Sequence, residues 1–232
     1  MYRNIKFYTT PDELKKAIFS APEGNTNASG PHDYPDRGGG GDIQGVSDVM
    51  AKAQESGGHV QSTADSYAER HGGVVTPINY KSEESIARKV KNEYGGDVSK
   101  LKDAVRTTVI VPDDKMEAVF QELQKDPNFI KVKWQRPDEY GGYSGIITNI
   151  MTPNGLVGEV QVNTAKMIYA KNNEKSAKKI LGEKKWNEIN KATGLPGGLG
   201  HKFYEEVRVM SPQDPKRAEV MKKQEEYYKN FL

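Results

Sequence analysis

The order of the expected elements predicts an α/β fold, in which a mixed β-sheet is flanked by helices. Three observations carry this prediction. Residues 104–111 form a short β-branched run, residues 113–125 form an amphipathic helix, and residues 142–164 contain two strands joined by a Pro-Asn-Gly turn at 153–155. Helices and strands in this order pack as layers against a common sheet.

Composition excludes several classes of protein. The 232 residues carry a formal net charge of only +2, so no strong whole-molecule field attracts nucleic acid or membrane. The absence of cysteine excludes disulfides, thiolate zinc sites and cysteine nucleophiles. The sequence has no run of about eighteen apolar residues, and its N-terminal segment lacks the apolar core of a signal peptide. The mean hydropathy of -0.79 indicates that part of the chain is not packed.

The domain boundaries follow changes in composition. A Thr-Pro-Asp-Glu sequence at residues 10–13 is typical of a helix start, which predicts an N-terminal helix within residues 1–20. Residues 21–46 are rich in Gly, Pro, Asn and Asp, and we interpret them as a flexible linker. Residues 47–210 are predicted to form the main domain, and residues 211–232 a C-terminal helix.

Local signals define the remaining elements. Residues 47–70 show helical spacing, and Ser82 can cap a helix that ends near residue 94, before two glycines. The amphipathic helix at 113–125 carries its apolar stripe on Met116, Val119, Phe120 and Leu123. In the remainder of the chain we expect a strand at 129–134, helices at 164–181, 184–192 and 215–232, a loop at 194–200, and a segment at 201–210 that is ambiguous between strand and helix.

The second strand of the hairpin has an unusual polar alternation. Glu159, Gln161 and Asn163 occupy every other position, so their side chains project from one face of the strand. Val160 and Val162 project from the other face. A carboxylate and two amides in an otherwise apolar strand are costly in a plain core, so they indicate a site for a metal ion or a nucleotide.

Lys81, Ser85 and Lys89 are spaced by four residues, which places them on one side of the predicted helix near its start. Two ammonium groups, a hydroxyl group and the positive end of a helix suit a polyphosphate ligand. The alternative is an ordinary solvated basic face.

Asp103 precedes the predicted strand at 104–111, and Glu159 lies on another strand. Two carboxylates from adjacent strands can bind Mg²⁺ and leave coordination positions for phosphate and water. The alternative for Asp103 is a turn residue, since aspartate is common in turns. Glu159 requires a partner in either case, because it lies between valines in a core strand.

Tyr143 follows two glycines, at positions 141 and 142. Glycine allows the backbone to approach a ligand closely, and a tyrosine at such a loop can stack on a nucleobase. The alternative is a packed aromatic side chain at the start of a strand.

Two further groups of polar residues are candidates for binding. Lys131 and Lys133 share one face of a predicted strand, and Arg136 follows them, so these residues can meet phosphates or solvent. His201 follows a glycine-rich loop and is a candidate polar site residue, with a structural or exposed histidine as the alternative. Motifs of zinc proteases, phosphate-binding loops and serine hydrolases are absent from the sequence.

Together these residues resemble a known family, the RelA/SpoT-like (p)ppGpp synthetase domain. The resemblance covers residues 79–167, with a weaker tail to Tyr204. Residues 79–89 (NYKSEESIARK) are similar to the family's R-x-K-x-x-x-S-I-x-x-K motif, and residues 101–106 (LKDAVR) to its acid-bearing strand. The hairpin matches the GYxSxH…G…ExQxRT block at Tyr143, Gly155, Glu159, Gln161 and Thr164, and Met167 fits the helix that follows.

The resemblance implies a nucleotidyltransferase-like fold and an activity. The implied enzyme is a Mg²⁺-dependent ATP pyrophosphokinase that transfers the β,γ-diphosphate of ATP to the 3′-hydroxyl of a purine nucleotide and makes (p)ppGpp or (p)ppApp. The implied catalytic residues are Asp103, Glu159 and Gln161, with Asp103 and Glu159 as metal ligands. The implied ATP-binding residues are Lys81, Ser85, Arg88, Lys89 and Lys133, and the implied acceptor-binding residues are Tyr143, Gln161, Asn163 and His201.

Three positions depart from the family motifs. Asn79 and Asn163 stand where the family has arginines, and Ile147 stands where it usually has histidine. The candidates to supply the missing positive charge are Arg88, Arg106 and Lys133. Strict strand alternation predicts Arg106 on the face opposite Asp103. Guanine specificity therefore does not carry over with the resemblance.

The sequence also resembles the toxin branch of this superfamily. This sequence has the synthetase motifs but no His-Asp hydrolase motif, and the synthetase motifs follow a predicted flexible leader. This implies an immunity protein or antitoxin as partner, and action in a cytoplasm, with secretion or delivery that needs no cleavable signal peptide.

Two alternatives remain open. The first is pyrophosphorylation of the tRNA 3′ end, motivated by Lys216, Arg217, Lys222 and Lys223 in the C-terminal helix. The second is an inactive nucleotide-binding interaction module, motivated by the missing arginines at positions 79 and 163.

Overall fold

The computed structural model describes residues 43–232. The predicted helix within residues 1–20, and all but the last residues of the predicted linker at 21–46, lie outside the described residues. Contacts group the described chain into two compact units. We call residues 43–133 and 146–162 the sheet unit, and residues 134–145 and 163–232 the helical unit. The domain boundaries expected from composition stay predictions.

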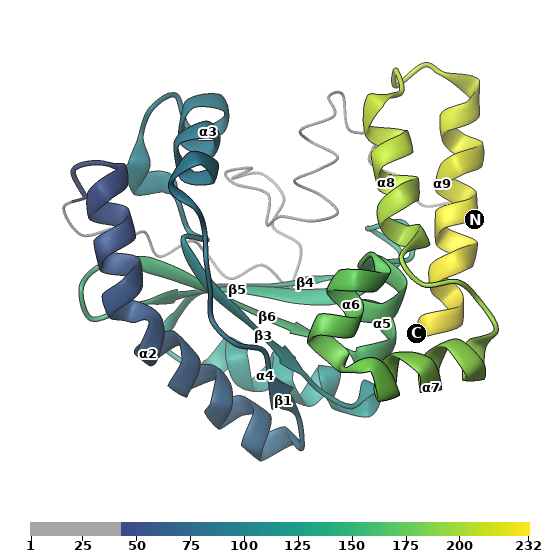
Figure 1. The fold of residues 1–232 in the computed structure, drawn as a ribbon, viewed down its shortest axis with the longest axis horizontal. Helices are drawn as coiled ribbons and strands as arrows, with labels where there is room; N and C mark the ends of the chain where they lie inside the picture. Colours follow the sequence, from purple (N-terminus) through teal and green to yellow (C-terminus); the bar gives the residue numbers. More distant parts are fainter. Residues whose placement is uncertain (1–42) are drawn as a thin grey trace. The chain divides into compact units, whose positions relative to one another are not determined.

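A six-stranded mixed sheet organises the first unit (Figure 1). Its strands are β1 (Val74–Val75), β2 (Asn79–Tyr80), β3 (Val105–Ile110), β4 (Phe129–Gln135), β5 (Gly145–Met151) and β6 (Val157–Asn163). The order is β1-β3-β6-β5-β4, and β2 pairs with β3 beside β1. The pairs β1–β3, β2–β3 and β5–β6 are antiparallel. A mixed sheet flanked by helices confirms the predicted fold class.

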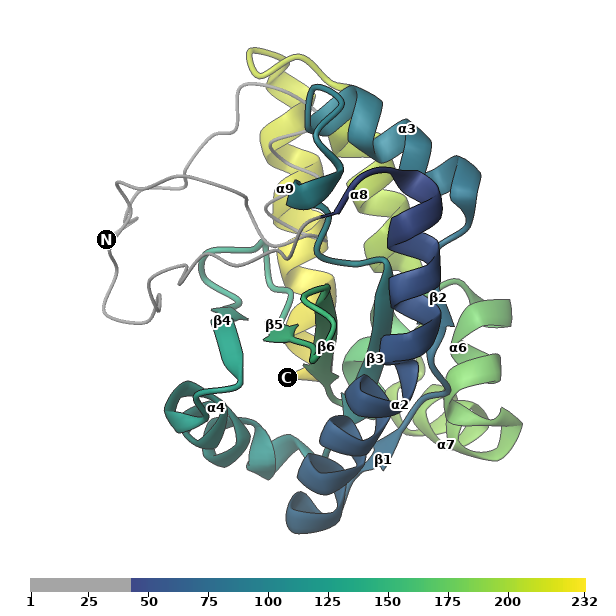
Figure 2. The same cartoon turned by 90° about the vertical axis from the view of Figure 1, so that its left-hand side faces the viewer.

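Three helices belong to the sheet unit: α2 (Val46–His71), α3 (Glu83–Glu93) and α4 (Met116–Lys125). Helices α2 and α4 lie side by side, because the Tyr67 hydroxyl donates to the Asp126 carboxylate at 2.8 Å and His71 Nε2 lies 2.6 Å from Glu122 Oε2 (Figure 2). Short 3₁₀ turns at Val98–Lys100 and Asp113–Lys115 connect the helices to the strands that flank them.

Helix α2 packs against one face of β6. A Cβ atom added at Gly158 would lie 2.9 Å from Val60 of α2, so position 158 requires glycine for this close approach. Because side chains alternate along a strand, Val160 and Val162 share the face of Gly158. Glu159 and Gln161 therefore project from the face of β6 that is turned away from α2.

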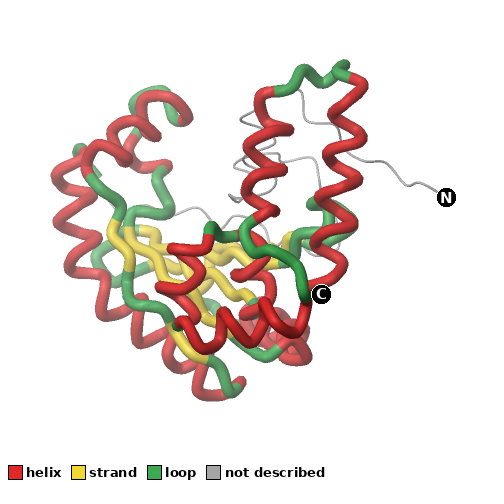
Figure 3. The backbone as a smooth tube through the Cα atoms, turned by 45° about the vertical axis from the view of Figure 1, so that its right-hand side comes forward, coloured by secondary structure: helices red, strands yellow, loops and turns green. Residues whose placement is uncertain are grey.

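The helical unit contains α5 (Ala165–Lys171), α6 (Glu174–Leu181), α7 (Glu183–Thr193), α8 (Leu199–Val209) and α9 (Pro215–Tyr228), followed by a 3₁₀ turn at Lys229–Phe231. Helices α8 and α9 run side by side (Figure 3). The core of the helical unit is rich in aromatic side chains, including Tyr143, Tyr169, Trp186, Tyr204, Tyr227, Tyr228 and Phe231. Among the described helices, none is long and apolar enough to cross a membrane.

Several predicted elements need correction. The helix expected at 164–181 is two helices, because Asn172 is extended and the Asn173 side chain caps α6 by accepting from the Ser176 amide at 2.9 Å. The ambiguous segment at 201–210 is helical, and α8 already begins at Leu199, inside the predicted loop. The predicted hairpin and the Ser82 cap of α3 are confirmed.

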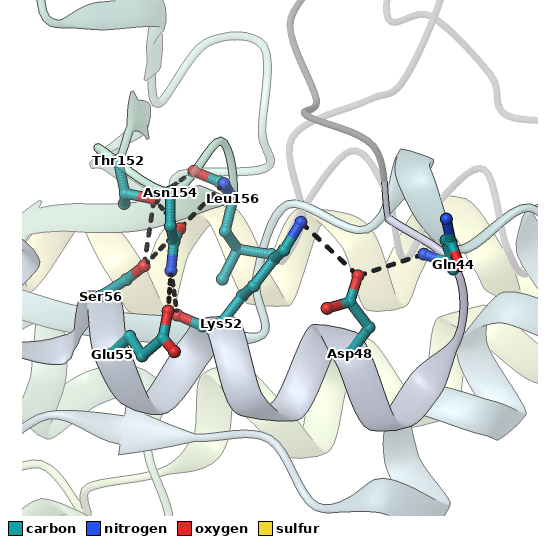
Figure 4. A network of polar contacts seen from close by, with 8 residues as sticks. All are labelled: Gln44, Asp48, Lys52, Glu55, Ser56, Thr152, Asn154 and Leu156. Carbon is teal, nitrogen blue, oxygen red and sulfur yellow. Dashed lines mark hydrogen bonds and ion pairs between the residues drawn. The ribbon is translucent and has the colours of Figure 1, made fainter.

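A polar network fastens the β5–β6 turn to α2 (Figure 4). The Asn154 Oδ1 atom accepts from Ser56 Oγ at 2.9 Å and from Thr152 Oγ1 at 2.8 Å. Its Nδ2 atom donates to the Lys52 carbonyl at 2.9 Å. One amide side chain thus satisfies groups from the turn and from α2, which holds the hairpin at a fixed place along the helix.

We expect Asn154→Ala to lower the free energy of unfolding by about 1–3 kcal/mol, because it leaves several hydrogen-bonding groups of this network without a partner. Urea denaturation measures the change. Gly58→Ala is the matched control in α2: position 58 is exposed with open space around it, so alanine should stabilise the helix by about 0.5–1 kcal/mol. An Asn154→Ala midpoint equal to that of the unchanged protein would contradict the assigned role of the network.

Candidate active site

Two lysines converge on Asp103 in the sheet unit. Lys81 Nζ donates to Asp103 Oδ2 at 2.6 Å, and Lys89 Nζ donates to the same oxygen at 3.1 Å. Helix α3 begins at Glu83, so Lys81 lies before the helix and the helical spacing inferred for it was wrong. Lys81 is instead positioned by strand pairing, since its amide donates to the Ala104 carbonyl at 2.9 Å beside the β2–β3 ladder.

The Asp103 side chain is only 12% exposed, yet it stays ionised. Burial raises the pKa of this carboxyl, but the Lys89 and Lys81 ammonium groups outweigh that effect and hold its pKa below the ordinary value. Both lysines bind Oδ2. The buried Oδ1 atom accepts no hydrogen bond from the residues that the structure describes, so this oxygen is available to another ligand.

The polar alternation predicted on β6 places two groups at the same site. Glu159 is 7% exposed, and Gln161 Nε2 donates to Glu159 Oε1 at 2.6 Å. Burial raises the pKa of Glu159, and the negative charge of Asp103 raises it further. The positive charges of Arg106 and Lys89 and the hydrogen bond from Gln161 oppose this rise without cancelling it.

This donor set fits a hard divalent cation. Two electrostatically coupled carboxylates carry one oxygen without a described partner, and such oxygens are the ligands that Mg²⁺ prefers. Within residues 43–232 no group of three or more His, Cys, Asp or Glu residues could hold a metal. The remaining ligands of a cation at Asp103 and Glu159 would therefore come from substrate oxygens and water, as is usual for Mg²⁺.

The other residues predicted to bind ATP are less closely joined to Asp103. The amide of Ser85 donates to Ser82 Oγ at 3.3 Å and its hydroxyl accepts from that group at 2.9 Å, so Ser85 takes part in the N-terminal cap of α3. Arg88 is exposed on α3, and no described contact connects it to Asp103. Lys133 lies on β4, which follows β5 in the sheet order.

Arg106 occupies a position that the sequence alone did not reveal. The β2–β3 register places Asn79 directly opposite Arg106. The Arg106 guanidinium therefore lies opposite position 79, where the family has arginine and this chain has asparagine. Arg106 also acts electrostatically on Glu159, whose pKa it lowers. The expectation that strand alternation separates it from this site was wrong, because Asp103 lies before β3 and alternation cannot be counted from it.

Tyr143 and Asn163 contact each other in the helical unit. Asn163 Nδ2 donates to the Tyr143 hydroxyl at 3.0 Å, and Asn163 Oδ1 accepts from the Thr164 amide at 2.9 Å. The Tyr143 ring is 2% exposed and packs edge to face on Tyr228 at 5.8 Å between centroids. The Lys171 ammonium lies 4.9 Å from the Tyr143 ring centroid. These contacts give both residues a packing role in this unit.

His201 lies on the surface of α8. Its side chain is 50% exposed, and its Nε2 atom lies 3.9 Å from Glu205 Oε1. The ring also stacks on Tyr204 at 6.3 Å between centroids. These contacts are local to the helix.

Asn149 is a buried polar residue that the sequence reading missed. It lies on β5, directly opposite Glu159 in the β5–β6 register. The available signal was an amide within an apolar strand, but recognising its relation to Glu159 requires the register of the hairpin.

Comparison with known proteins identifies relatives. No family model matches the chain. The (p)ppApp synthetase toxin Tas1 of Pseudomonas aeruginosa (strain UCBPP-PA14) is 38% identical over 180 residues, which are 78% of this chain and 41% of Tas1. The crystal structure of the Type VI effector Tas1 with its immunity protein matches with a TM-score of 0.75 and 36% identity, over 80% of this chain and 95% of the solved chain.

A more distant match is the small alarmone synthetase 1 from Bacillus subtilis, with 13% identity and a TM-score of 0.40 over 78% of this chain and 86% of that chain. The chain spans about two fifths of the full-length curated relative, but it covers nearly all of the solved Tas1 chain. The 36% identity over nearly all of that chain shows that this protein belongs to the RelA/SpoT-like synthetase family that includes Tas1.

Proposed function

We propose that this protein is a Mg²⁺-dependent ATP pyrophosphokinase of the toxin type, which transfers the β,γ-diphosphate of ATP to the 3′-hydroxyl of a purine nucleotide. The cluster of Lys81, Lys89, Asp103 and Glu159 is the observation that supports this function most strongly. The name of Tas1, a (p)ppApp synthetase toxin, favours an adenine nucleotide over a guanine nucleotide as the acceptor.

The residues around Asp103 suit the binding of a triphosphate. Lys81 and Lys89 are only 20% and 16% exposed, so their charges are weakly screened and can bind phosphate oxygens strongly. Asp103 and Glu159 would hold Mg²⁺, which supplies charge neutralisation for the phosphates when bound. Ser85, Arg88, Arg106 and Lys133 are proposed as further contacts to ATP, with Arg106 compensating for the asparagine at position 79.

Glu159 is proposed as the general base. Burial and the neighbouring Asp103 raise its pKa, which makes the ionised carboxylate a stronger base, and the Gln161 hydrogen bond fixes its orientation. The acceptor 3′-oxygen forms a bond to the β-phosphorus while the bond from this phosphorus to the α,β-bridging oxygen breaks. AMP leaves, and the hydroxyl proton passes to Glu159.

The acceptor contacts of Tyr143, Asn163 and His201 are proposed from the family motif and its tail. The described contacts of Tyr143 and Asn163 equally support a packing role, because each hydrogen-bonds the other. Stacking of Tyr143 on a base would require a ring face to become free of its neighbours in the helical unit.

The partners and the place of action are proposed from the same relationship. Tas1 is a Type VI effector that forms a complex with an immunity protein. We infer that this chain likewise is delivered into a target cell, acts on nucleotides in the cytoplasm, and is neutralised by an immunity protein.

The tRNA alternative gains no support from the C-terminal helix. Arg217 is 4% exposed and donates to the Met210 carbonyl at 3.3 Å. The Lys223 ammonium lies 2.6 Å from a Glu219 oxygen, and the Lys222 ammonium 3.8 Å from a Glu226 oxygen. These local partners reduce the positive charge that α9 could offer to a nucleic-acid backbone.

Incubation with γ-labelled ATP and single acceptors tests the proposed function. We expect labelled product with adenine nucleotides, and a loss of about a hundredfold or more in rate for Glu159→Gln and for Asp103→Asn, because each change removes a charged group from the reacting centre. Asp114→Asn is the matched control: this exposed carboxylate lies on a 3₁₀ turn outside the cluster, and its loss should leave the rate unchanged.

Two results would contradict this proposal. Preferential labelling of tRNA would favour transfer to RNA. Nucleotide binding without product from any acceptor would favour the inactive interaction module.

We expect the affinity for Mg²⁺ to rise with pH. The pKa of Glu159 lies above its ordinary value of 4.5, so a proton competes with the cation at this carboxylate in mildly acidic solution. Asp103 has a lowered pKa and stays ionised over the same range, so it contributes no pH dependence there. Calorimetric titration with Mg²⁺ at several pH values measures the effect.

The Glu159→Gln variant is the control for the pH dependence. It should bind Mg²⁺ more weakly and with an affinity that does not change across this range. In Asp103→Asn the rise should move to lower pH, because the charge that raises the pKa of Glu159 is gone. A wild-type affinity that is independent of pH would show that Glu159 is not a ligand.

A further inference from the structure

Asn149 and Glu159 form a directly opposed pair on adjacent strands. The β5–β6 register pairs Asn149 with Glu159 and Ile147 with Gln161. Opposed residues of an antiparallel pair place their side chains on the same face, with Cβ atoms about 4.5–5.5 Å apart. Asn149 therefore belongs to the face that carries the proposed general base.

The side chain of Asn149 is only 2% exposed, and its amide makes no hydrogen bond to the residues that the structure describes. The amide atoms are not among the fully enclosed side-chain atoms without a partner, so they keep access to a group that enters from solvent. Its neighbour Thr148 points to the other face, and its hydroxyl donates to the Val160 carbonyl at 2.7 Å. Polar groups buried in a protein are nearly always paired, and leaving one without a partner destabilises the fold. The amide on the Glu159 face is therefore available to a ligand that binds beside Glu159.

The sheet order indicates which ligand lies near Asn149. Strand β6 lies between β3 and β5. Asp103, which immediately precedes β3, and the two lysines that bind it lie on one side of Glu159, and Asn149 lies on the other. The side of Asp103 is the proposed site of the ATP phosphates. The acceptor hydroxyl must also reach Glu159. If the acceptor binds on the side of Asn149, it does not displace ATP phosphates from Lys81 and Lys89.

We propose that Asn149 binds the acceptor nucleotide and holds its ribose beside Glu159. This inference rests on the proposed function. An amide can donate to one ribose oxygen and accept from a neighbouring hydroxyl group. It is also neutral, whereas a carboxylate at position 149 would raise the pKa of Glu159 further and repel the phosphates. Asn149 is therefore a specificity-determining contact for a ribonucleotide acceptor.

The test is the Asn149→Leu variant, which keeps the side-chain volume and removes the amide. We expect the acceptor KM to rise about tenfold, as for the loss of one or two hydrogen bonds, while the KM for ATP and the Kd for Mg²⁺ stay unchanged. The melting temperature without nucleotide should stay equal or rise, because leucine adds apolar surface at a largely buried position where the amide bonds no described residue.

Thr148→Val is the matched control on the same strand. It removes the hydroxyl that bonds the Val160 carbonyl, so the melting temperature should fall while the acceptor KM stays unchanged. If Asn149→Leu does not fold, Asn149→Ala is measured in the same way.

An unchanged acceptor KM in the folded variant would overturn the proposal. A weaker Mg²⁺ affinity with an unchanged acceptor KM would also overturn it, because Asn149 would then be a cation ligand.

If the unaltered protein transfers no diphosphate, the proposed function fails. Calorimetric binding of ADP in the presence of α,β-methylene-ATP then decides on Asn149: weaker binding by Asn149→Leu supports the contact, and equal binding overturns it.

Discussion

Asp103 and Glu159 are two carboxylates, only 12% and 7% exposed, within electrostatic reach of each other, and this proximity constrains the rest of the site. Lys81 and Lys89 keep Asp103 ionised, at 2.6 and 3.1 Å from a single oxygen. Burial and the negative charge of Asp103 raise the pKa of Glu159, and the hydrogen bond that it accepts from Gln161 opposes this rise only in part. A divalent cation bound at this pair would relieve the repulsion between the carboxylates and would give the unpaired Asp103 oxygen a partner. The fold therefore prepares a place for positive charge and for the phosphates that accompany it.

The elements that could be predicted from sequence are those with local causes. The alternation of Glu159 and Gln161 on β6 is confirmed, because a period of two along a strand is independent of tertiary context. The Ser82 cap and the Pro-Asn-Gly turn at 153–155 are likewise confirmed, since each depends on a few adjacent residues. The break at Asn172-Asn173 was missed because helical spacing continues across it, although asparagine competes for backbone hydrogen bonds.

Features of the site that depend on strand register could not be predicted. Lys81 reaches Asp103 because β2 pairs with β3, and a helical count from Ser85 cannot show this. The same register brings Arg106 opposite Asn79, and the β5–β6 register brings Asn149 opposite Glu159. The departure from the family motif at position 79 is thus accompanied by an arginine on the neighbouring strand, and only the pairing of the strands reveals this.

The coupling between the two carboxylates can be measured directly by ¹³C NMR titration of the Glu159 carboxyl group. In the protein without metal, its pKa should lie above the ordinary 4.5. Saturating Mg²⁺ and, separately, Asp103→Asn should each lower it, because the first adds positive charge at the site and the second removes negative charge. A Glu159 pKa at or below the ordinary value, unchanged by Mg²⁺ and by Asp103→Asn, would contradict the assignment of this pair as the metal-binding and catalytic centre.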